Sequence, residues 1–355
     1  MTRHLSFPLA VWFFVLLFCH AAYALGTPPA FESLAAMSSY PFVADMLPDG
    51  RFILVDSAGT VWLQTGLYND AYEELATGYA GDPGFIAASP DAHTVVICSG
   101  FGGHYWFLDI KHPVDAGTPL SCVDGSGTPI SLTSSYWGEW ISADRLLVDR
   151  APVFLESELG IIDFSGSVPV YKVVVNGKDG ASAAFTLDAS GRNVYACLGT
   201  GDTGLTRRFA VADLSQAFDE GGPLAWSSGV AVGAFEGAGP FACTDKGTLI
   251  YGAFGYLLFA DPVTGETATA TPPGGDFIYM GSGAYSSVTG RLLISGTDYS
   301  DWPNVTAMAW SSHQGYENLP VGGLFPAAVL AILLILVGTP RLKRAKVWQA
   351  PCLER

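Results

Sequence analysis

One short segment combines aromatic and acidic side chains at a spacing suited to ligand binding. In "SSYWGEW", residues 134–140, Tyr136, Trp137 and Trp140 flank Glu139. Aromatic rings stack on the apolar face of a sugar, and a carboxylate accepts hydrogen bonds from its hydroxyl groups. The segment therefore predicts a glycan-binding site. Its alternative is structural: Trp140 begins a strand and the other rings pack between neighbouring sheets.

A second candidate is "GFGGHYW", residues 100–106. Gly102 and Gly103 allow the backbone to approach a ligand closely, and His104 is a candidate base. A bulged hairpin explains the same glycines without a ligand.

The sequence has no recognisable enzyme signature. It lacks G-x-S-x-G, H-E-x-x-H, a phosphate-binding loop and the D-x-[DN]-x-[DN]-G calcium loop, and its histidines do not have the spacing of metal ligands. We therefore predict no metal and no cofactor, and we favour a non-enzymatic protein.

Charge narrows the choice of partners. The chain has 17 Lys and Arg against 33 Asp and Glu, a net charge of −16, and several of the basic residues lie at its two ends. Such a surface repels phosphate backbones, so nucleic acid is excluded as a partner. The scattered acids indicate a solubilising surface, with cation binding as the alternative.

The amino-terminal residues 1–24 have the form of a signal peptide. An apolar run from Leu9 to Phe18 follows Arg3, and "AYA" ends at Ala24 as a cleavage site. The alternative is an uncleaved anchor helix. Export would place four cysteines, Cys98, Cys122, Cys197 and Cys243, in an oxidising compartment. We predict a Cys98–Cys122 disulfide because this pair is the most local, with buried free thiols as the alternative.

A second membrane signal lies near the carboxyl terminus. Residues 316–340 contain an apolar run long enough to span a bilayer, and the basic residues of 341–355 would remain in the cytoplasm. The order of parts resembles the sorting signals of bacterial surface proteins of the exosortase or rhombosortase type. The residues that carry this resemblance are Pro320, Gly322, Gly323, Arg341, Lys343 and Arg344. The resemblance implies a sorting protease as a partner; a plain single-span anchor is the alternative.

Six similar units fill the region between these signals. They begin at Phe42, Phe85, Glu139, Ala184, Phe241 and Ala284. Each unit reads as an apolar strand, a tight polar turn, a second apolar strand, a polar link and a third strand. The second turn residues recur 42 to 56 residues apart, at Gly50, Ala92, Asp144, Gly191, Gly247 and Gly290.

This period predicts an all-β fold, a β-propeller of six to seven blades. A seventh blade would lie in the link from Val114 to Tyr136 or be completed by residues 26–39. Pairing of an amino-terminal strand with the last blade would close the ring. Four acids that close third strands, Asp109, Asp163, Asp213 and Asp261, are predicted to cap turns and not to catalyse a reaction.

The turns carry a family resemblance. "SPDA" before "TVVICSG", and "LDASG" before "NVYACLG", resemble the turn and second strand of YVTN-type and WD-type propeller repeats. The resemblance implies the propeller fold and leaves the function open.

These observations define four regions: a signal peptide at 1–24, a propeller at 25–315, a linker and transmembrane helix at 316–340, and a basic cytoplasmic tail at 341–355. We predict an extracytoplasmic protein of the periplasm or cell surface that is held by the membrane and binds a protein or glycan. The alternative is a propeller enzyme, either a lactonase-like hydrolase or a quinoprotein-like dehydrogenase subunit.

Overall fold

Each of the six sequence units forms a sheet of antiparallel strands in the computed structural model of the protein, and the third sheet also gains two strands that pair in parallel with β14 (Val170–Asn176). The structure describes residues 31–33, 42–69, 71–79, 82–132, 135–153, 156–176, 183–198, 205–226, 229–231, 237–253, 255–271, 279–298 and 306–312. All of them belong to one unit of the chain, Ala24–Pro320. The sheets are numbered here in chain order.

The first three sheets contain the strands β2 to β14, and β18 joins the third. The first sheet is β2 (Phe42–Met46), β3 (Phe52–Asp56), β4 (Val61–Gln64) and β5 (Tyr72–Ala76). The second is β6 (Pro83–Ala88), β7 (Thr94–Ser99) and β8 (Tyr105–Asp109). The third runs from β11 (Gly138–Trp140) through β12 (Arg145–Val153), β13 (Glu156–Asp163) and β14 (Val170–Asn176) to β9 (Cys122–Asp124) and β10 (Pro129–Ile130), and β18 (Leu224–Ala225) also pairs with β14.

The last three sheets follow the same plan. The fourth is β15 (Ala183–Leu187), β16 (Asn193–Leu198), β17 (Leu205–Ala210) and β19 (Val230–Ala231). The fifth is β20 (Gly237–Cys243), β21 (Leu249–Ala253), β22 (Leu257–Ala260) and β23 (Thr267–Ala270). The sixth is β24 (Tyr279–Ser286), β25 (Arg291–Asp298), β26 (Thr306–Ser312) and, at its edge, β1 (Phe31–Ser33).

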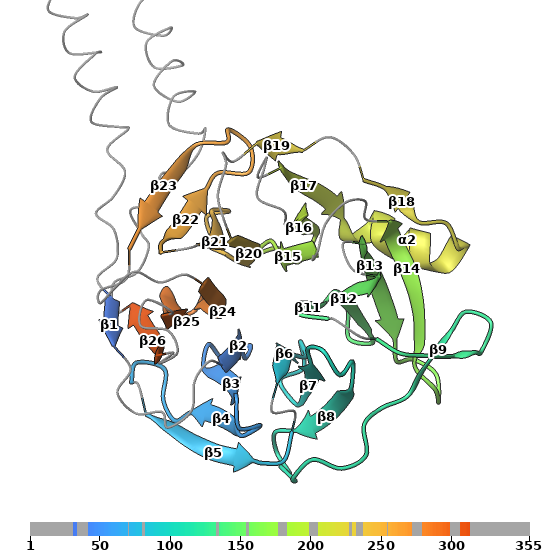
Figure 1. Ribbon diagram of the computed structural model, residues 1–355, viewed down its shortest axis with the longest axis horizontal. Helices are drawn as coiled ribbons and strands as arrows, with labels where there is room; N and C mark the ends of the chain where they lie inside the picture. Colours follow the sequence, from blue (N-terminus) through green and yellow to red (C-terminus); the bar gives the residue numbers. More distant parts are fainter. Residues whose placement is uncertain are drawn as a thin grey trace, which may run out of the picture. The chain divides into compact units, whose positions relative to one another are not determined.

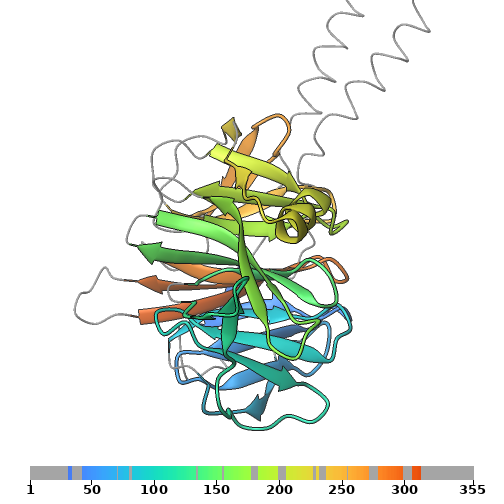
Figure 2. The same cartoon turned by 90° about the vertical axis from the view of Figure 1, so that its right-hand side faces the viewer.

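The sheets form a closed ring, as in a β-propeller, with the first strand of every unit nearest the centre (Figure 1). Six apolar clusters hold the ring together, one between each pair of consecutive sheets, and the sixth joins the last sheet to the first through Leu293, Ala284, Phe52 and Leu54. The second strands are rich in apolar residues because both of their faces are covered by neighbouring sheets; all five residues of β3 and of β21 are buried. The perpendicular view shows the strands running between the two faces of the ring (Figure 2).

The amino-terminal strand closes the last sheet, as the sequence predicted. β1 pairs antiparallel with β26, with Phe31 opposite Ser312 and Ser33 opposite Trp310. This pairing covers the outer edge of β26, which would otherwise present unpaired backbone groups.

Most of the predicted turn chemistry is confirmed. The carboxylates of Asp109, Asp163 and Asp261 each accept a hydrogen bond from the backbone N–H two residues later, at 2.8, 2.8 and 2.7 Å. Ala92 has a φ of 59° at the turn position where four other units have glycine with positive φ. Five of the six units therefore have a left-handed backbone at this position, and the third unit, with Asp144, does not.

Two local predictions are wrong. The link from Val114 to Tyr136 does not hold a seventh blade among its described residues; it contributes β9 and β10 to the outside of the third sheet. Asp213 lies in the first turn of helix α2 (Val211–Glu220), and no side-chain hydrogen bond caps this helix. The repeat pattern did not predict this helix, which is ten residues long and is the only one in the described part of the chain. It packs its apolar side, Leu214, Ala217 and Phe218, on the cluster between the third and fourth sheets.

The predicted Cys98–Cys122 disulfide is not formed, because a strand separates the two residues. Cys98 pairs with Tyr105 of β8, and Tyr105 pairs on its other side with Leu120, two residues before Cys122. Two strand spacings amount to about 10 Å, beyond the roughly 7 Å that a disulfide can bridge. The structure has Cys98, Cys122, Cys197 and Cys243 as free thiols. Burial raises the pKa of the Cys122 thiol to about 11, so it behaves as a small apolar side chain.

The predicted signal peptide, transmembrane helix and sorting motif lie outside the described residues. Within the described ranges, no helix is long and apolar enough to cross a membrane.

Candidate functional site

A cavity of about 430 Å³ lies in the centre of the ring. The innermost strands of all six sheets, β2, β6, β11, β15, β20 and β24, contribute to its walls. Its size falls within the range of pockets that enclose small ligands, about 300 to 1,000 Å³.

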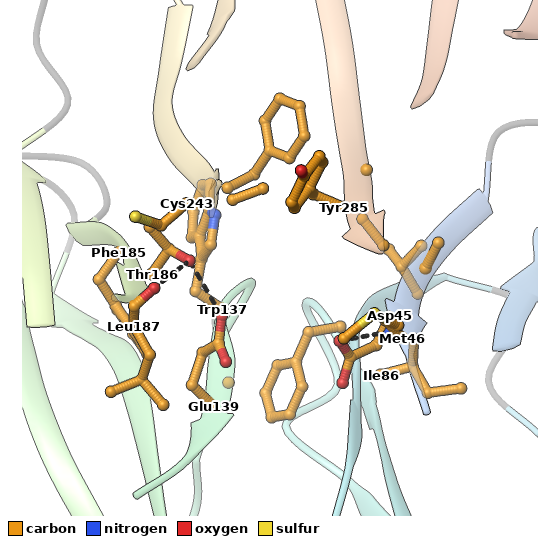
Figure 3. Close-up of a pocket in the computed structure, with 18 of the residues that line it drawn as sticks. Asp45, Met46, Ile86, Trp137, Glu139, Phe185, Thr186, Leu187, Cys243 and Tyr285 are labelled. Atoms are coloured by element: carbon orange, nitrogen blue, oxygen red, sulfur yellow. Dashed lines mark hydrogen bonds between the residues drawn. The ribbon is translucent and has the colours of Figure 1, made fainter. Parts of the chain in front are cut away.

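Two carboxyl groups enter this cavity from different sheets. Asp45 of β2 and Glu139 of β11 extend toward the space between them, from opposite sides (Figure 3). Asp45 Oδ2 accepts a hydrogen bond of 2.7 Å from the Ala88 N–H, and its Oδ1 accepts one of 2.6 Å from the Met46 N–H. These bonds leave the remaining lone pairs of the carboxylate available to a ligand.

The Glu139 carboxyl is held from the neighbouring fourth sheet. The hydroxyl of Thr186 donates to Glu139 Oε1 at 3.3 Å, and the Leu187 backbone N–H also donates to this carboxyl group. The hydrogen bonds fix the orientation of a side chain that has three rotatable bonds.

The environment separates the pKa values of the two acids. Withdrawal from bulk water raises the pKa of Asp45 to about 6, against the lowering effect of the Ala88 and Met46 hydrogen bonds. Burial, together with the negative charge of Asp45, raises the pKa of Glu139 to about 8. The coupled pair therefore holds its proton more tightly on Glu139, which favours an ionised acceptor at Asp45 and a neutral carboxylic acid, able to donate, at Glu139.

Aromatic and apolar side chains form most of the remaining wall. Six aromatic residues line the cavity: Phe85, Tyr136, Trp137, Phe185, Phe241 and Tyr285. The Phe85 ring lies directly against Gly138, where a Cβ atom would come within 2.1 Å of it. Glycine at 138 therefore lets the ring lie flat beside the strand that carries Glu139.

A buried carboxyl holds the segment that carries Trp137. Asp149 Oδ1 accepts hydrogen bonds of 2.7 Å from the backbone N–H groups of both Tyr136 and Trp137. The Ser135 hydroxyl donates to the Asp149 carbonyl at 2.6 Å, while Asp149 Oδ2 is buried without a partner. Burial raises the pKa of Asp149 to about 7.

The structure brings three of the predicted site residues to the cavity. Tyr136, Trp137 and Glu139 line it. Trp140 does not: it is buried, its Nε1–H donates to the Ala87 carbonyl at 3.1 Å, and its ring packs on Phe164. Trp140 is therefore a packing residue, as in the structural alternative, but it ends the strand β11 and does not begin one.

His104 is also outside the cavity. It is exposed, its backbone N–H donates to the Ser99 hydroxyl, and its ring lies at the edge of Trp106. The histidine therefore has no contact that would make it a base for a ligand in the ring.

The two predicted segments nevertheless meet. The ring of Phe101, from "GFGGHYW", packs edge-on against Tyr136, from "SSYWGEW", with 5.7 Å between ring centroids. Gly100 is required at this contact, because a Cβ atom there would lie 2.6 Å from the Tyr136 ring.

Sequence reasoning missed Asp45, Thr186 and Tyr285, although the repeat contained a signal for them. Asp45, Glu139, Thr186 and Tyr285 each stand five positions before the second turn residue of their unit. The other two units have Ala87 and Ala242 at this position. Alignment of the turns therefore identifies one position per unit on the innermost strand, and four of the six residues there are polar.

The described part of the chain contains no group of three or more His, Cys, Asp or Glu side chains arranged to hold a metal ion.

Sequence comparison gives no family: no protein-family model and no curated protein sequence matches the chain. Solved structures do match. The gluconolactonase of Xanthomonas campestris is 12% identical, with a TM-score of 0.56 over 82% of this chain and 92% of that one. Regucalcin from Agrobacterium tumefaciens, a calcium-binding protein, is 12% identical, with a TM-score of 0.54 over 84% of this chain and 98% of that one. The β-propeller domain of Swd1 from Myceliophteria thermophila is 12% identical, with a TM-score of 0.53 over 80% of this chain and 99% of that one. At this identity the likeness concerns the fold alone, and the chain has the fold of a β-propeller.

Proposed function

We propose that this protein is an exported β-propeller that binds a neutral sugar residue in its central cavity, between Asp45 and Glu139. The observation that carries the proposal is the pair of carboxyl groups directed into an aromatic-walled cavity from opposite sides. Carboxyl groups at two sides of one ligand fix its orientation as well as its position.

The chemistry of the walls suits a sugar. A pyranose ring presents apolar C–H faces and a rim of hydroxyl groups, so it needs rings for its faces and paired donors and acceptors for its edge. Trp137, Tyr285 and the phenylalanines supply the rings. Asp45 supplies acceptors, and neutral Glu139 supplies a donor and an acceptor.

Charge selects neutral sugars over acidic ones. The chain carries a net charge of −16, and the cavity contains acids without a facing Lys or Arg in its wall. A uronic acid or sialic acid would meet repulsion from Asp45.

The proposal includes six blades, one for each sheet, and an extracytoplasmic location. The apolar run before Ala24 and the apolar run before Arg341 support export and anchoring. Amino-terminal sequencing of the mature protein tests the first of these: we expect Leu25 as the first residue, and a chain that begins at Met1 contradicts cleavage.

Glu139→Gln is expected to weaken binding of a neutral sugar about tenfold at pH 7. The amide keeps the size of the side chain but replaces its hydroxyl donor with an amide N–H, and it cannot adjust its proton to the ligand. Asp45→Asn is expected to have an effect of similar size because it replaces a charged acceptor. The measurement is calorimetric titration with the best neutral ligand from a glycan array.

Glu73→Gln is the matched control, because Glu73 is exposed on the outer strand β5 and the substitution is chemically the same. Unchanged affinity in Glu139→Gln and Asp45→Asn together would place any glycan site outside the cavity. Acidic glycans as the best ligands would contradict the charge argument.

A second candidate function is a hydrolase that acts on a sugar lactone or glycoside. The specific observation in its favour is the pKa difference between the two acids, which gives a proton acceptor and a proton donor in one cavity near pH 7. The structural neighbour from Xanthomonas campestris is a gluconolactonase. Turnover of aryl glycosides or lactones, with a maximum between about pH 6 and pH 8 and lost in Glu139→Gln, would establish this function. Binding without turnover excludes it for those substrates.

A further inference from the structure

An exposed aromatic side chain lies beside the cavity, and neither the fold nor the proposed sugar contacts account for it. The Phe101 ring is 72% exposed. Among the large hydrophobic aromatic residues that the structure describes, only Tyr68 is comparably exposed, at 73%, and it lies in the loop between β4 and β5. A large apolar ring in water is unfavourable, so its retention beside a cavity points to a ligand.

Three rings form a continuous path from the surface to the cavity. Phe101 packs edge-on against Tyr136, and Tyr136 lies 6.2 Å from Trp137 between ring centroids. Tyr136 and Trp137 both line the cavity, and Glu139 follows two residues after Trp137. The aromatic surface is therefore continuous with the site of the proposed sugar.

The loop that carries Phe101 is well anchored. The Gly100 backbone N–H donates to the Asp82 carbonyl at 2.8 Å, and the Phe101 N–H donates to Asp82 Oδ2 at 3.3 Å. The Gly103 N–H donates to the Ser99 carbonyl at 3.0 Å, with Gly103 at a φ of 62°. A platform whose backbone is fixed in advance costs less entropy when a ligand stacks on it.

We propose that Phe101 and Tyr136 form a second subsite, which stacks the next sugar of a neutral glycan whose terminal residue occupies the central cavity. This inference rests on the proposed function and narrows it: the ligand is a chain of at least two sugars, bound by its end. The cavity recognises hydroxyl groups through its carboxyls, whereas the platform recognises an apolar ring face and offers no charged side chain of its own.

The test compares neutral glycans of one to four residues from the same series. We expect the wild-type, full-length protein to bind the trisaccharide about tenfold more tightly than the monosaccharide, a difference of about 1.4 kcal/mol. Phe101→Ala should lose this gain and keep the affinity for the monosaccharide within about twofold. Phe101→Trp should retain the gain, because it preserves the stacking surface.

Tyr68→Ala is the matched control, as it removes an equally exposed ring that does not line the cavity. Equal affinity of the wild-type protein for all chain lengths, or an unchanged length dependence in Phe101→Ala, overturns the subsite while the proposed function stands. Failure of every neutral glycan to bind overturns the proposed function and the subsite together. A loss of monosaccharide affinity in Phe101→Ala equal to the loss for the trisaccharide assigns Phe101 to the support of the cavity and also overturns the subsite.

Discussion

The wild-type protein is expected to lose stability as the pH rises from 5 to 8, and Asp149→Asn is expected to remove a large part of this loss. Asp149 is fully buried, and its Oδ2 has no hydrogen-bond partner. The ionised form therefore places a negative charge in the core, whereas the asparagine is neutral and keeps an oxygen for the N–H groups of Tyr136 and Trp137.

The direction of this pH dependence follows from the difference in proton binding between the folded and the unfolded protein. The pKa of Asp149 is about 7 in the folded protein and 3.8 for an ordinary aspartate, so the folded state binds the proton more tightly. This contribution to stability is complete below about pH 4 and disappears as the pH rises through 7. With 1.36 kcal/mol for each pKa unit, the loss between pH 5 and pH 8 is about 3 kcal/mol. Glu139 and Asp45 act in the same direction, since their pKa values are also raised.

Urea denaturation at pH 5 and pH 8 measures the effect. At pH 5 the wild type and Asp149→Asn should have similar midpoints, and at pH 8 the variant should be more stable by about 2 to 3 kcal/mol. Asp124→Asn is the control: the pKa of that exposed turn residue is lowered, so the same substitution should leave the dependence above pH 5 unchanged. Parallel curves for the wild type and Asp149→Asn would contradict the assignment of a buried, protonated carboxyl.

Gly138→Ala is expected to destabilise the protein by about 3 kcal/mol and to abolish ligand binding in the cavity. The new methyl group would lie 2.1 Å from the ring of Phe85. That ring is buried and packs edge-on against Tyr105, with 5.8 Å between centroids, so it cannot move further into the core. The remaining space is the cavity itself, and the displaced ring would occupy it.

A double-mutant cycle separates this mechanism from a general loss of structure. Phe85→Leu in the Gly138→Ala background should recover at least about 1 kcal/mol and part of the binding, because the smaller side chain removes the clash. Gly117→Ala is the control, since nothing lies within 4 Å of a Cβ atom at that position. Additive effects of the two substitutions would show that the contact between the Phe85 ring and Gly138 is not the cause.

The fold was predictable because its information is local and repeated. Turn residues such as Gly50 and Gly191, with apolar strands on both sides, specify one sheet each, and their recurrence specifies the ring. Tyr136, Trp137 and Glu139 were predictable because their chemistry is concentrated within one short segment.

The rest of the site depends on contacts between distant units. Asp45 lies 94 positions before Glu139, and only closure of the ring brings the two carboxyls to one cavity. The predicted Cys98–Cys122 disulfide was wrong for the opposite reason. The two cysteines are close in the sequence, but β8 lies between them in the fold. The role of Phe101 also required the structure, because its partner Tyr136 belongs to another sheet and another segment.

The seam between β1 and β26 also bears on how the protein folds. Phe31 precedes its partner Ser312 by about 280 positions in the chain, so these strands pair only when the two ends of the propeller meet. Until they pair, β26 presents an open edge at the outside of the sixth sheet. Contacts of very large sequence separation form slowly, so we expect the ring to close late in folding. A chain with an open seam exposes a strand edge to other chains, and we expect aggregation to compete with folding most strongly before the seam closes.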